Sequence, residues 1–432
     1  MAIQWFSQPP PGWISKRLKF VAPLRISRAA GSSEEPEYIG LENIESWTGR
    51  HVKIASADPI GDDEIKTLGT SSCFSEGDIL FGKLRPYLAK ALLAKQDGIC
   101  STEFLVLQPH ANIDARFLLY ILLCPEFIKL INSSTFGAKM PRANWDFIGA
   151  VHVPLPQIAV QRRIADYLDA ETAQIDALVA EKERMLALLE EKRAALISRA
   201  VTRGLDPDVP LKPSGLEWLG DIPAHWEIRR LGFLFILQGG CTPSKPNDEF
   251  WKGEIAWASS KDIKQQILTD TEDHVSDEAM DKTGLSLIEP PVVLLVVRGM
   301  ILAKRIPTSL TGIPVTINQD LKALKPDETW ISPIYLKLLF DGLQAPLASL
   351  IEESAHGTKC FRTDLLTTFK VPLPPLPEQT EIISLLSRER TRTAELEETL
   401  HRSIALLKER RSALITAAVT GQLQISDNQS NR

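Results

Sequence analysis

Two short stretches of the chain carry residue types that bind phosphate groups. In each, a glycine is followed two positions later by a lysine and three positions after that by an arginine. Glycine lets a backbone approach a ligand closely, while lysine and arginine reach a phosphate or a guanine edge. The recurrence favours contact with a nucleic-acid backbone; alternatively, both stretches only shape a loop. The residues are Gly137, Lys139 and Arg142 in the first stretch and Gly357, Lys359 and Arg362 in the second.

Two further groups of cations follow predicted strands. The first lies in the run GKLRPYLAK and joins positive charge to an aromatic ring, a combination that suits a nucleic-acid groove. The second follows the apolar run 292–297. For both groups the alternative is an ordinary turn at the end of a strand. The candidate contacts are Lys83, Arg85 and Tyr87 in the first group and Arg298, Lys304 and Arg305 in the second.

The motifs of the common nucleic-acid enzymes are absent from the sequence. The stretch EPPV at 289–292 lacks the polar and aromatic ends of the [ND]-P-P-[YFW] loop that receives a flipped base. There is no G-x-x-x-x-G-K-[ST], H-E-x-x-H, G-x-S-x-G or G-x-G-x-x-G, and the histidines show no metal-ligand spacing. We therefore expect a chain that catalyses nothing alone and binds no cofactor or metal.

Composition narrows the class of protein. A chain of 432 residues with 44% apolar residues has room for two to three domains. Its net charge of −6 requires a nucleic-acid reader to gather positive charge on one face. The five cysteines are scattered, without a C-x-x-C pair, which predicts a reducing, cytoplasmic setting. No leader-like or membrane-spanning run is visible, so we expect no membrane association.

A long segment is repeated. Residues 153–205 align without a gap on 371–423, and each copy opens with V-P-L-P and continues without interior glycine or proline, which predicts a long helix. Leucines and isoleucines recur at seven-residue spacing, as in a coiled-coil seam. The alternative is an amphipathic helix packed on its own domain. The predicted seam consists of Leu168, Ile175, Leu189 and Leu196 with a companion register at Leu178 and Met185, and of Leu386, Leu400, Leu407 and Leu414 with Leu396.

The segments before the two helices also match, with shifting offsets. PPGWISKRL faces PAHWEIRRL, aligning Trp13 with Trp226. Short β-like runs alternate with helical ones such as 116–130 and 333–343, so the predicted fold class is α+β, two similar mixed domains in tandem, each followed by a long helix. The two helices are expected to pair with each other as an antiparallel coiled coil with pseudo-two-fold symmetry. The expected divisions are 1–152, 153–205, 206–370, 371–425 and a polar tail at 426–432.

The phrases GLEWLGDIPAHWEIRRL, VPLPPLPEQTEI and KRAALISRAVTRGL, in a domain, helix, domain, helix layout, resemble the specificity subunit of type I restriction-modification enzymes. The resemblance covers essentially the whole chain. It implies two target recognition domains, each reading one half of a gapped, asymmetric sequence in double-stranded DNA, with the helices as spacer. It also implies two modification (methyltransferase) subunits and restriction subunits as partners. These partners would use S-adenosylmethionine, ATP and Mg to methylate adenine and to cleave DNA.

One departure from the family pattern stands at the first helix. It begins PLPQIAVQ where the second begins PLPPLPEQ, so Val160 replaces Glu378. Equal partner affinity at the two helix starts is therefore in question. Two rival functions remain at this stage. A coiled-coil scaffold or adaptor would bind no DNA, and a nuclease would depend on Glu190, Glu191 and Lys192, whose mid-helix setting instead suits a solvated face.

Overall fold

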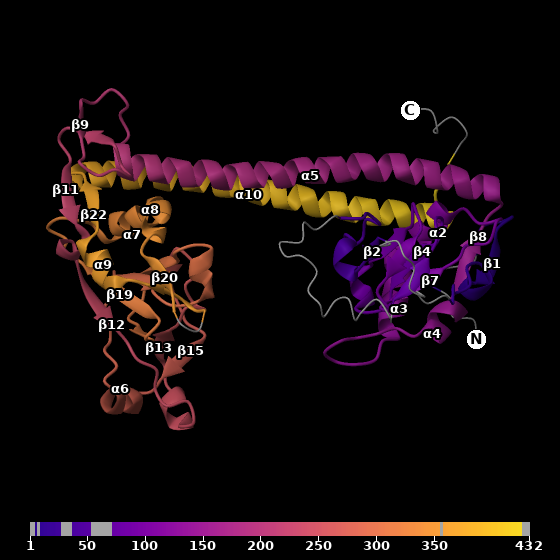
Figure 1. Ribbon diagram of the computed structural model, residues 1–432, viewed down its shortest axis with the longest axis horizontal. Coiled ribbons are helices and arrows are strands. Elements are labelled where there is room, and N and C mark those ends of the chain that lie inside the picture. Colours follow the sequence, from indigo (N-terminus) through magenta and orange to yellow (C-terminus); the bar gives the residue numbers. More distant parts are fainter. Residues whose placement is uncertain (1–4, 7–8, 27–36, 53–70, 355–356, 426–432) are drawn as a thin grey trace. The chain divides into compact units, whose positions relative to one another are not determined.

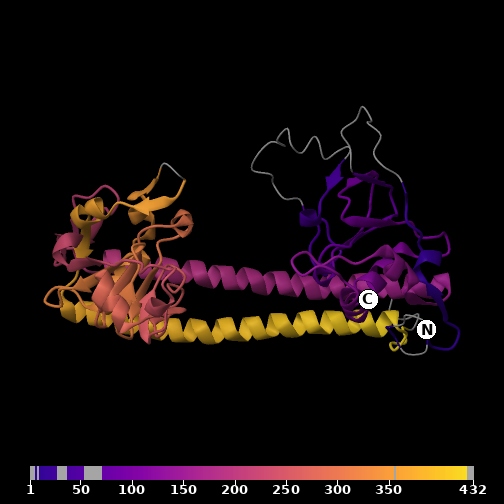
Figure 2. The same ribbon diagram turned by 90° about the horizontal axis from the view of Figure 1, so that it is seen from below.

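The computed structural model describes residues 5–6, 9–26, 37–52, 71–354 and 357–425, and the predicted tail lies outside them. The chain forms two compact units, one built from residues up to 183 and from 401 onward, the other from 184 to 400. Two helices, α5 (Ile158–Arg203) and α10 (Leu376–Val419), each contribute to both units. The first unit contains the start of α5 and the end of α10, so the helices run antiparallel (Figure 1 and Figure 2).

The first unit is built around a three-stranded antiparallel sheet in the order β5-β4-β7. Side chains of β4 alternate between two cores, as strand geometry requires. Ile79 and Phe81 face the helices, whereas Leu80 packs in a second cluster beside the β2-β6-β3 sheet. The elements are β1 (Ile14–Arg17), η1 (Leu18–Phe20), β2 (Tyr38–Ile39), η2 (Leu41–Asn43), β3 (Ser72–Phe74), β4 (Ile79–Gly82), η4 (Pro86–Leu88), β5 (Ala91–Leu93), β6 (Gly98–Cys100), β7 (Phe104–Leu107), α2 (Ala115–Leu122), α3 (Pro125–Ser133), α4 (Trp145–Ala150) and β8 (His152–Leu155).

The helical run predicted over 116–130 is divided into α2 and α3. Asp114 caps α2, its side chain accepting from the backbone N–H groups of Arg116 and Phe117 at 3.0 and 3.1 Å. Pro125 occupies the first turn of α3, where its missing N–H costs nothing. Within a continuous helix the same proline would remove a hydrogen bond, so the helix ends before it.

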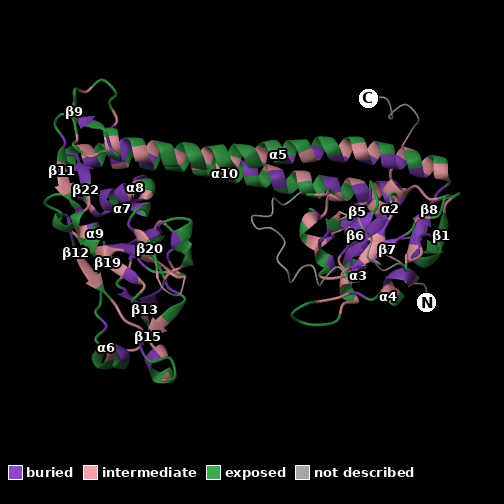
Figure 3. Ribbon diagram, in the orientation of Figure 1, coloured by how far each residue is buried: buried purple, intermediate pink, exposed green. Residues whose placement is uncertain are grey.

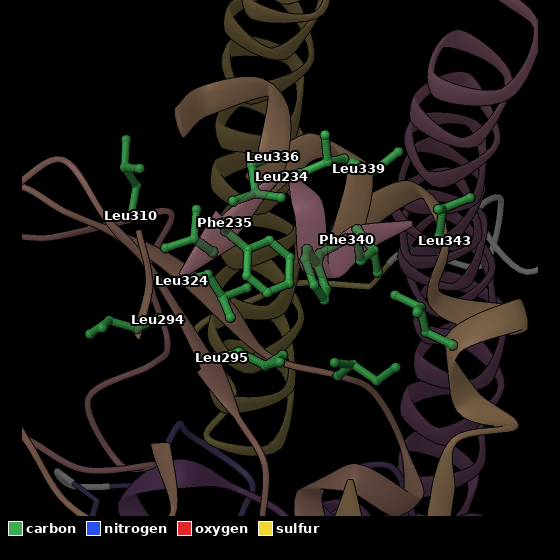
Figure 4. Packing of buried hydrophobic residues seen from close by; sticks show 14 of the residues in the cluster. Leu234, Phe235, Leu294, Leu295, Leu310, Leu324, Leu336, Leu339, Phe340 and Leu343 are labelled. Atoms are coloured by element: carbon green, nitrogen blue, oxygen red, sulfur yellow. The ribbon is translucent and has the colours of Figure 1, made fainter. Parts of the chain in front are cut away.

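The second unit contains a five-stranded sheet in the order β12-β19-β16-β17-β14. All four residues of β16 are buried, and Phe235 meets Phe340 of α7 with ring centroids 6.4 Å apart (Figure 4). The elements are β9 (Leu211–Pro213), β10 (Asp221–Pro223), β11 (Glu227–Arg230), η5 (Leu231–Phe233), β12 (Phe235–Gly239), η6 (Asp248–Trp251), β13 (Ile255–Ala258), β14 (Ile267–Leu268), β15 (Asp273–Val275), α6 (Asp277–Thr283), β16 (Val293–Val296), η7 (Met300–Ala303), β17 (Thr308–Thr311), β18 (Thr316–Ile317), β19 (Leu321–Pro326), α7 (Pro333–Gly342), α8 (Gln344–Ala348), β20 (Ile351–Glu353), β21 (Lys359–Phe361), α9 (Thr363–Thr368) and β22 (Lys370–Leu373).

One buried glutamine in each repeated segment joins the helix to its domain. In the first unit Gln161 accepts from the backbone N–H of Asp114 at 2.9 Å and donates to the carbonyl of Pro156 at 2.9 Å. In the second, Gln379 accepts from the backbone N–H of Ser332 at 3.0 Å and donates to the carbonyl of Pro374 at 3.0 Å. The glutamine that follows each V-P-L-P segment therefore satisfies equivalent backbone groups in the two units. The predicted class, a duplicated α+β domain plus long helix, is confirmed.

The helices meet along a seam within each unit, and one predicted register of it is wrong. Leu168, Ile175, Leu386 and Leu400 are buried, and Leu189, Leu196, Leu407 and Leu414 are partly buried. The companion residues Leu178, Met185 and Leu396 are 51%, 40% and 42% exposed. Figure 3 shows buried, intermediate and exposed residues interspersed along both α5 and α10. The predicted companions lie three residues after positions of the leucine register. The residues that are buried instead lie four residues after such positions, at Thr172, Val179, Ile404, Arg411 and Ala418.

Polar residues occupy the second register because their polar groups are satisfied. Thr172 donates to the carbonyl of Leu168 at 2.6 Å, and the Arg411 guanidinium donates to Asp176 at 3.0 Å and to the carbonyl of Trp47 at 2.8 Å. A count of apolar residues passes over these positions and selects the exposed leucines instead. Buried polar side chains are tolerated where they are hydrogen-bonded.

Candidate nucleic-acid interface

In the first unit, the loop that carries Gly137, Lys139 and Arg142 is a tight hairpin. The backbone N–H groups of Phe136 and Arg142 donate to each other's carbonyls at 3.1 and 3.0 Å. Gly137 has a φ of +92°, a conformation that favours glycine. Lys139 and Met140 are exposed at the tip. The hairpin therefore projects a cation and an apolar side chain together.

The residues after β4 lie against this hairpin. The backbone N–H of Arg85 donates to the carbonyl of Pro141 at 2.7 Å, and that of Ala143 donates to the carbonyl of Lys83 at 3.0 Å. Arg85 adopts a left-handed φ of +50° directly before η4, and its side chain is exposed. The structure thus brings together two groups that are at least 50 residues apart in the sequence, 83–87 and 137–142.

Carboxylates already bind some of these cations. Arg142 donates two hydrogen bonds to Glu103, at 3.1 Å through Nε and 2.9 Å through an Nη. Hydrogen bonding to Arg142 lowers the pKa of Glu103, and the nearby charge of Lys83 lowers it further, whereas burial raises it. The same pairing raises the pKa of Arg142. A phosphate that binds Arg142 must therefore compete with Glu103.

The second unit has a corresponding hairpin, formed by β20 and β21. The backbone N–H of Gly299 donates to the carbonyl of Lys359 at 3.0 Å, and that of Phe361 donates to the carbonyl of Val297 at 2.8 Å. Arg298 lies opposite Cys360, so this candidate cation also flanks the hairpin. Lys83 and Arg85 therefore lie beside the first hairpin and Arg298 beside the second, whereas Arg305 lines a pocket together with residues of α5 and α10.

Acidic residues also bind the cations of this second hairpin. Lys359 pairs with Glu353 at 2.6 Å. Arg362 pairs with Asp364 at 2.7 Å and with Glu352 at 2.8 Å. Hydrogen bonds from Arg362 lower the pKa of Asp364 to about 2, and both carboxylates raise the pKa of Arg362.

The two Gly-x-Lys-x-x-Arg stretches are not structurally equivalent. Pro141 and Lys359 accept the corresponding backbone hydrogen bonds, so Arg142 corresponds to Cys360. Arg362 instead corresponds to Asn144, since each precedes the short helix that follows, α9 or α4. The prediction that these arginines match is wrong by two residues, because the second hairpin is longer. Residues 353–359 lie between its paired residues Glu352 and Cys360, whereas only residues 137–141 lie between Phe136 and Arg142. The constant offset of the long helices that follow gives the correct register.

Five predicted cations have no carboxylate partner within the described part of the chain, and apolar side chains are exposed near them. Tyr87, Phe136 and Met140 are 45%, 62% and 48% exposed in the first unit, and Met300 and Ile301 are 64% and 36% exposed in the second. Sequence reasoning passed over all of these except Tyr87, because an isolated apolar residue in a loop usually indicates core. The cations are Arg85, Lys139, Arg298, Lys304 and Arg305.

The two units hold the helix pair differently. In the first, Arg116 pairs with Asp169 at 2.8 Å and Tyr120 donates to Asp169 at 2.7 Å. In the second, α7 packs against α5 at Gly342, and a pocket of about 210 Å³ beside this contact is lined by Arg193, Arg390 and Lys337 among others. Burial lowers the pKa of Lys337, although the charge of Asp341, 2.7 Å away, raises it.

The described part of the chain includes the residues of the suggested nuclease centre and both long helices. Glu190, Glu191 and Lys192 are exposed on α5 and form no assembled site. Among the described residues, no group of three or more His, Cys, Asp or Glu side chains is placed to hold a metal ion. In the same part of the chain, no helix combines the length and apolar character needed to cross a membrane.

The duplicated domain, its hairpins and the paired helices define a class of protein. The chain matches the family described as Type I restriction modification DNA specificity domain over residues 52–186 and 223–406, and it belongs to that family. Family membership favours DNA recognition over the scaffold interpretation.

Among individual relatives, the chain is 30% identical over 254 residues to the EcoR124I/EcoR124II specificity subunit of Escherichia coli, covering 59% of this chain and 57% of that protein. It is 23% identical over 413 residues to the HindI specificity subunit of Haemophilus influenzae, covering 81% and 87%. A chain solved in work on complex assembly and conformational transition of the type I R-M system shares the fold, with a TM-score of 0.72, 21% identity and coverage of 96% of this chain and 100% of that one.

Proposed function

We propose that this chain is the DNA-recognition subunit of a type I restriction-modification complex. The observation that supports this function best is the duplicated frame with divergent surfaces. The strands that flank the long helices, the short helices before them and the buried glutamines recur in both units. The hairpins differ in length and in charge, with Lys139 at the tip of the first and the Lys359–Glu353 pair on the second.

Such an arrangement suits a target whose two halves differ. Each hairpin presents unpaired or competitively paired cations together with exposed apolar side chains, and these can contact phosphates and bases. Because the two surfaces share no register at Arg142 and Arg362, they should read different bases. The target is then gapped and asymmetric, with one half-site for each unit.

On this proposal the chain has no catalytic role. Two modification subunits bound to it methylate adenine with S-adenosylmethionine, and restriction subunits use ATP and Mg to cleave unmodified DNA. The long paired helices act as the spacer between the readers. The chain binds no cofactor itself.

The test is a methylation map. We expect co-expression with the methyltransferase subunit of the same system to produce adenine methylation at one gapped, asymmetric motif in genomic DNA. Methylation should disappear when this chain is omitted. Methylation that persists at the same motif without the chain would overturn the proposal.

A second measurement distinguishes a DNA reader from a scaffold. The affinity of the assembled complex for duplex DNA should fall steeply between 50 and 200 mM salt, because bound phosphates release counterions. A complex with salt-independent or absent duplex binding would not be a DNA reader.

A further inference from the structure

An eight-residue sequence recurs at the entrance to each unit. It reads WISKRLKF from Trp13 to Phe20 and WEIRRLGF from Trp226 to Phe233, so both copies contain Arg-Leu-x-Phe. Each copy forms a strand and then a single 3-10 turn, β1 with η1 and β11 with η5. The two turns are held alike, since the leucine N–H donates to the carbonyl of Val151 at 2.8 Å in one unit and to that of Phe369 at 2.8 Å in the other.

Folding explains only part of this shared sequence. Leu18 and Leu231 are 0% and 1% exposed, so their retention follows from packing. Phe20 and Phe233 are 61% and 66% exposed and contribute little to either core. A single exposed phenylalanine is ordinary, but two at equivalent positions, on surfaces that otherwise diverge, need a reason outside the fold.

An exposed arginine precedes each exposed phenylalanine by three residues. Arg17 and Arg230 stand three residues before Phe20 and Phe233, at the start of each 3-10 turn. Each arginine is the extended N-cap residue directly before the turn, and the phenylalanine is the last residue of the turn. Both arginines are exposed and have no carboxylate partner within the described ranges.

The surroundings add further positive charge. In the first unit Lys16 precedes Arg17, and the Lys19 ammonium lies 5.2 Å from the centroid of the Phe20 ring. In the second, the guanidinium carbon of Arg229 lies 4.0 Å from the centroid of the Trp330 ring, and Arg229 also pairs with Glu227 at 2.8 Å. The complementary surface is therefore an apolar pocket bordered by carboxylates.

We propose that Arg17 with Phe20 and Arg230 with Phe233 form a duplicated docking site that binds the same protein twice. A partner present in two identical copies meets identical residues in both units, whereas two different DNA half-sites require different ones. This inference rests on the proposed function, which supplies that partner as the modification subunit. Each partner molecule receives one phenylalanine of this chain in an apolar pocket that lies beside an acidic side chain of the partner, an arrangement typical of interface hot spots.

The test counts subunits. The full chain is co-purified with the methyltransferase subunit, and the complex is measured by native mass spectrometry and by titration. We expect two copies on the unaltered chain. Phe20→Ala and Phe233→Ala should each weaken one binding event roughly 30-fold and leave the other unchanged, and the double variant should weaken both.

Matched controls separate docking from folding and from DNA binding. Ile236 is 71% exposed, three residues beyond Phe233, and the corresponding position in the first unit is Pro23, so Ile236→Ala should bind both copies normally. Arg17→Glu and Arg230→Glu change charge without removing apolar surface and should repeat the phenylalanine results. Unaltered melting temperatures of the variants would show that they remain folded.

Three outcomes overturn the inference. Variants that still bind two copies with affinity changed less than threefold would exclude this docking site. Variants that keep two copies but lose duplex affinity tenfold would assign the surface to DNA. An unaltered chain that binds no methyltransferase subunit would remove the proposed function and this inference together.

Discussion

Removing the guanidinium of Arg411 should loosen the first unit at the helix pair. This side chain is 9% exposed and pairs with Asp176, which is 12% exposed. It also donates to the carbonyl of Trp47 at 2.8 Å, joining α10 to the loop after η2. Arg411→Ala therefore leaves a nearly buried carboxylate and a carbonyl without one of their donors. A charged hydrogen bond contributes about 1.5–3 kcal/mol and a neutral one about 1 kcal/mol, so we expect a loss of about 3 kcal/mol.

The remaining partner of Asp176 sets an upper limit on the effect. Arg50 also pairs with Asp176, so the carboxylate is not left alone. The full cost of an orphaned buried ion pair, about 3–5 kcal/mol, is then not reached. Asp176→Ala should cost a similar amount, and the double variant should cost less than the sum of the two single variants.

The second unit supplies a matched control for this experiment. Arg193 occupies the position of Arg411 in the other repeated helix, but Ala394 stands where Asp176 would be. Arg193 lines the pocket and has no carboxylate partner among the described side chains. Arg193→Ala should therefore change stability by less than about 0.5 kcal/mol.

Local hydrogen exchange is the appropriate assay, because a chain with two units need not unfold in one step. Arg411→Ala should accelerate exchange in residues 401–419 and 43–52, and Arg193→Ala should not accelerate exchange in the corresponding part of α5. Equal acceleration in both variants would refute the reasoning, since it would show that packing of the arginine stems, rather than the ion pair, holds the helices.

Three further predictions concern the hairpins and the second helix start. Lys139→Ala should weaken binding of the complex to all duplexes alike and reduce the salt slope by about one, measured by fluorescence anisotropy; a change confined to one sequence would mean base reading instead. Glu103→Gln should strengthen duplex binding by freeing Arg142. In the unaltered protein, binding should tighten only as the pH falls below the ordinary pKa of a glutamate, because the lowered pKa of Glu103 keeps this carboxylate charged and paired with Arg142 above that pH. Unchanged affinity would show that Arg142 does not meet DNA. Glu378→Val introduces the residue that the first helix has at the matching position, Val160, and removes the carboxylate that accepts the Trp226 indole N–H at 2.9 Å. We expect it to lower the free energy of unfolding of the second unit by about 1–2 kcal/mol, measured by denaturant unfolding. Val160→Glu in the first unit is the comparison.

The elements that the sequence predicts best are those with long, uninterrupted periodicity. The repeat of 153–205 on 371–423 predicted both long helices and their pairing. The absence of interior glycine and proline in each segment and the V-P-L-P sequence at its start are local signals that mark where a helix begins and how far it continues. Pro125 was also a local signal, and it divides the helix predicted over 116–130. Elements of two or three residues, such as β2 and β14, have no such signature, since their pairing depends on distant partners.

The candidate site was predictable in composition but not in register. Arg142 and Arg362 match in a sequence comparison that ignores hairpin length, and only the backbone pairing with 83–85 and 297–299 reveals the shift. The second helix register failed for a different reason. Arg411 is buried through hydrogen bonds to Asp176 and Trp47, which lie far away in the sequence, and apolar spacing contains no information on those partners.

On the proposed function, the acidic neighbours of the hairpin cations raise the requirement for binding DNA in a protein whose net charge is already −6. Three carboxylates form ion pairs with these cations: Glu103 with Arg142, Glu353 with Lys359 and Asp364 with Arg362. On the proposed function, any sequence must displace these internal competitors before it gains a phosphate contact. A random stretch of genome gains too little to do so, whereas the correct half-site adds base contacts that make the exchange favourable. The carboxylates would thus set a threshold for engagement, and we expect the chain to release wrong sites quickly while it searches.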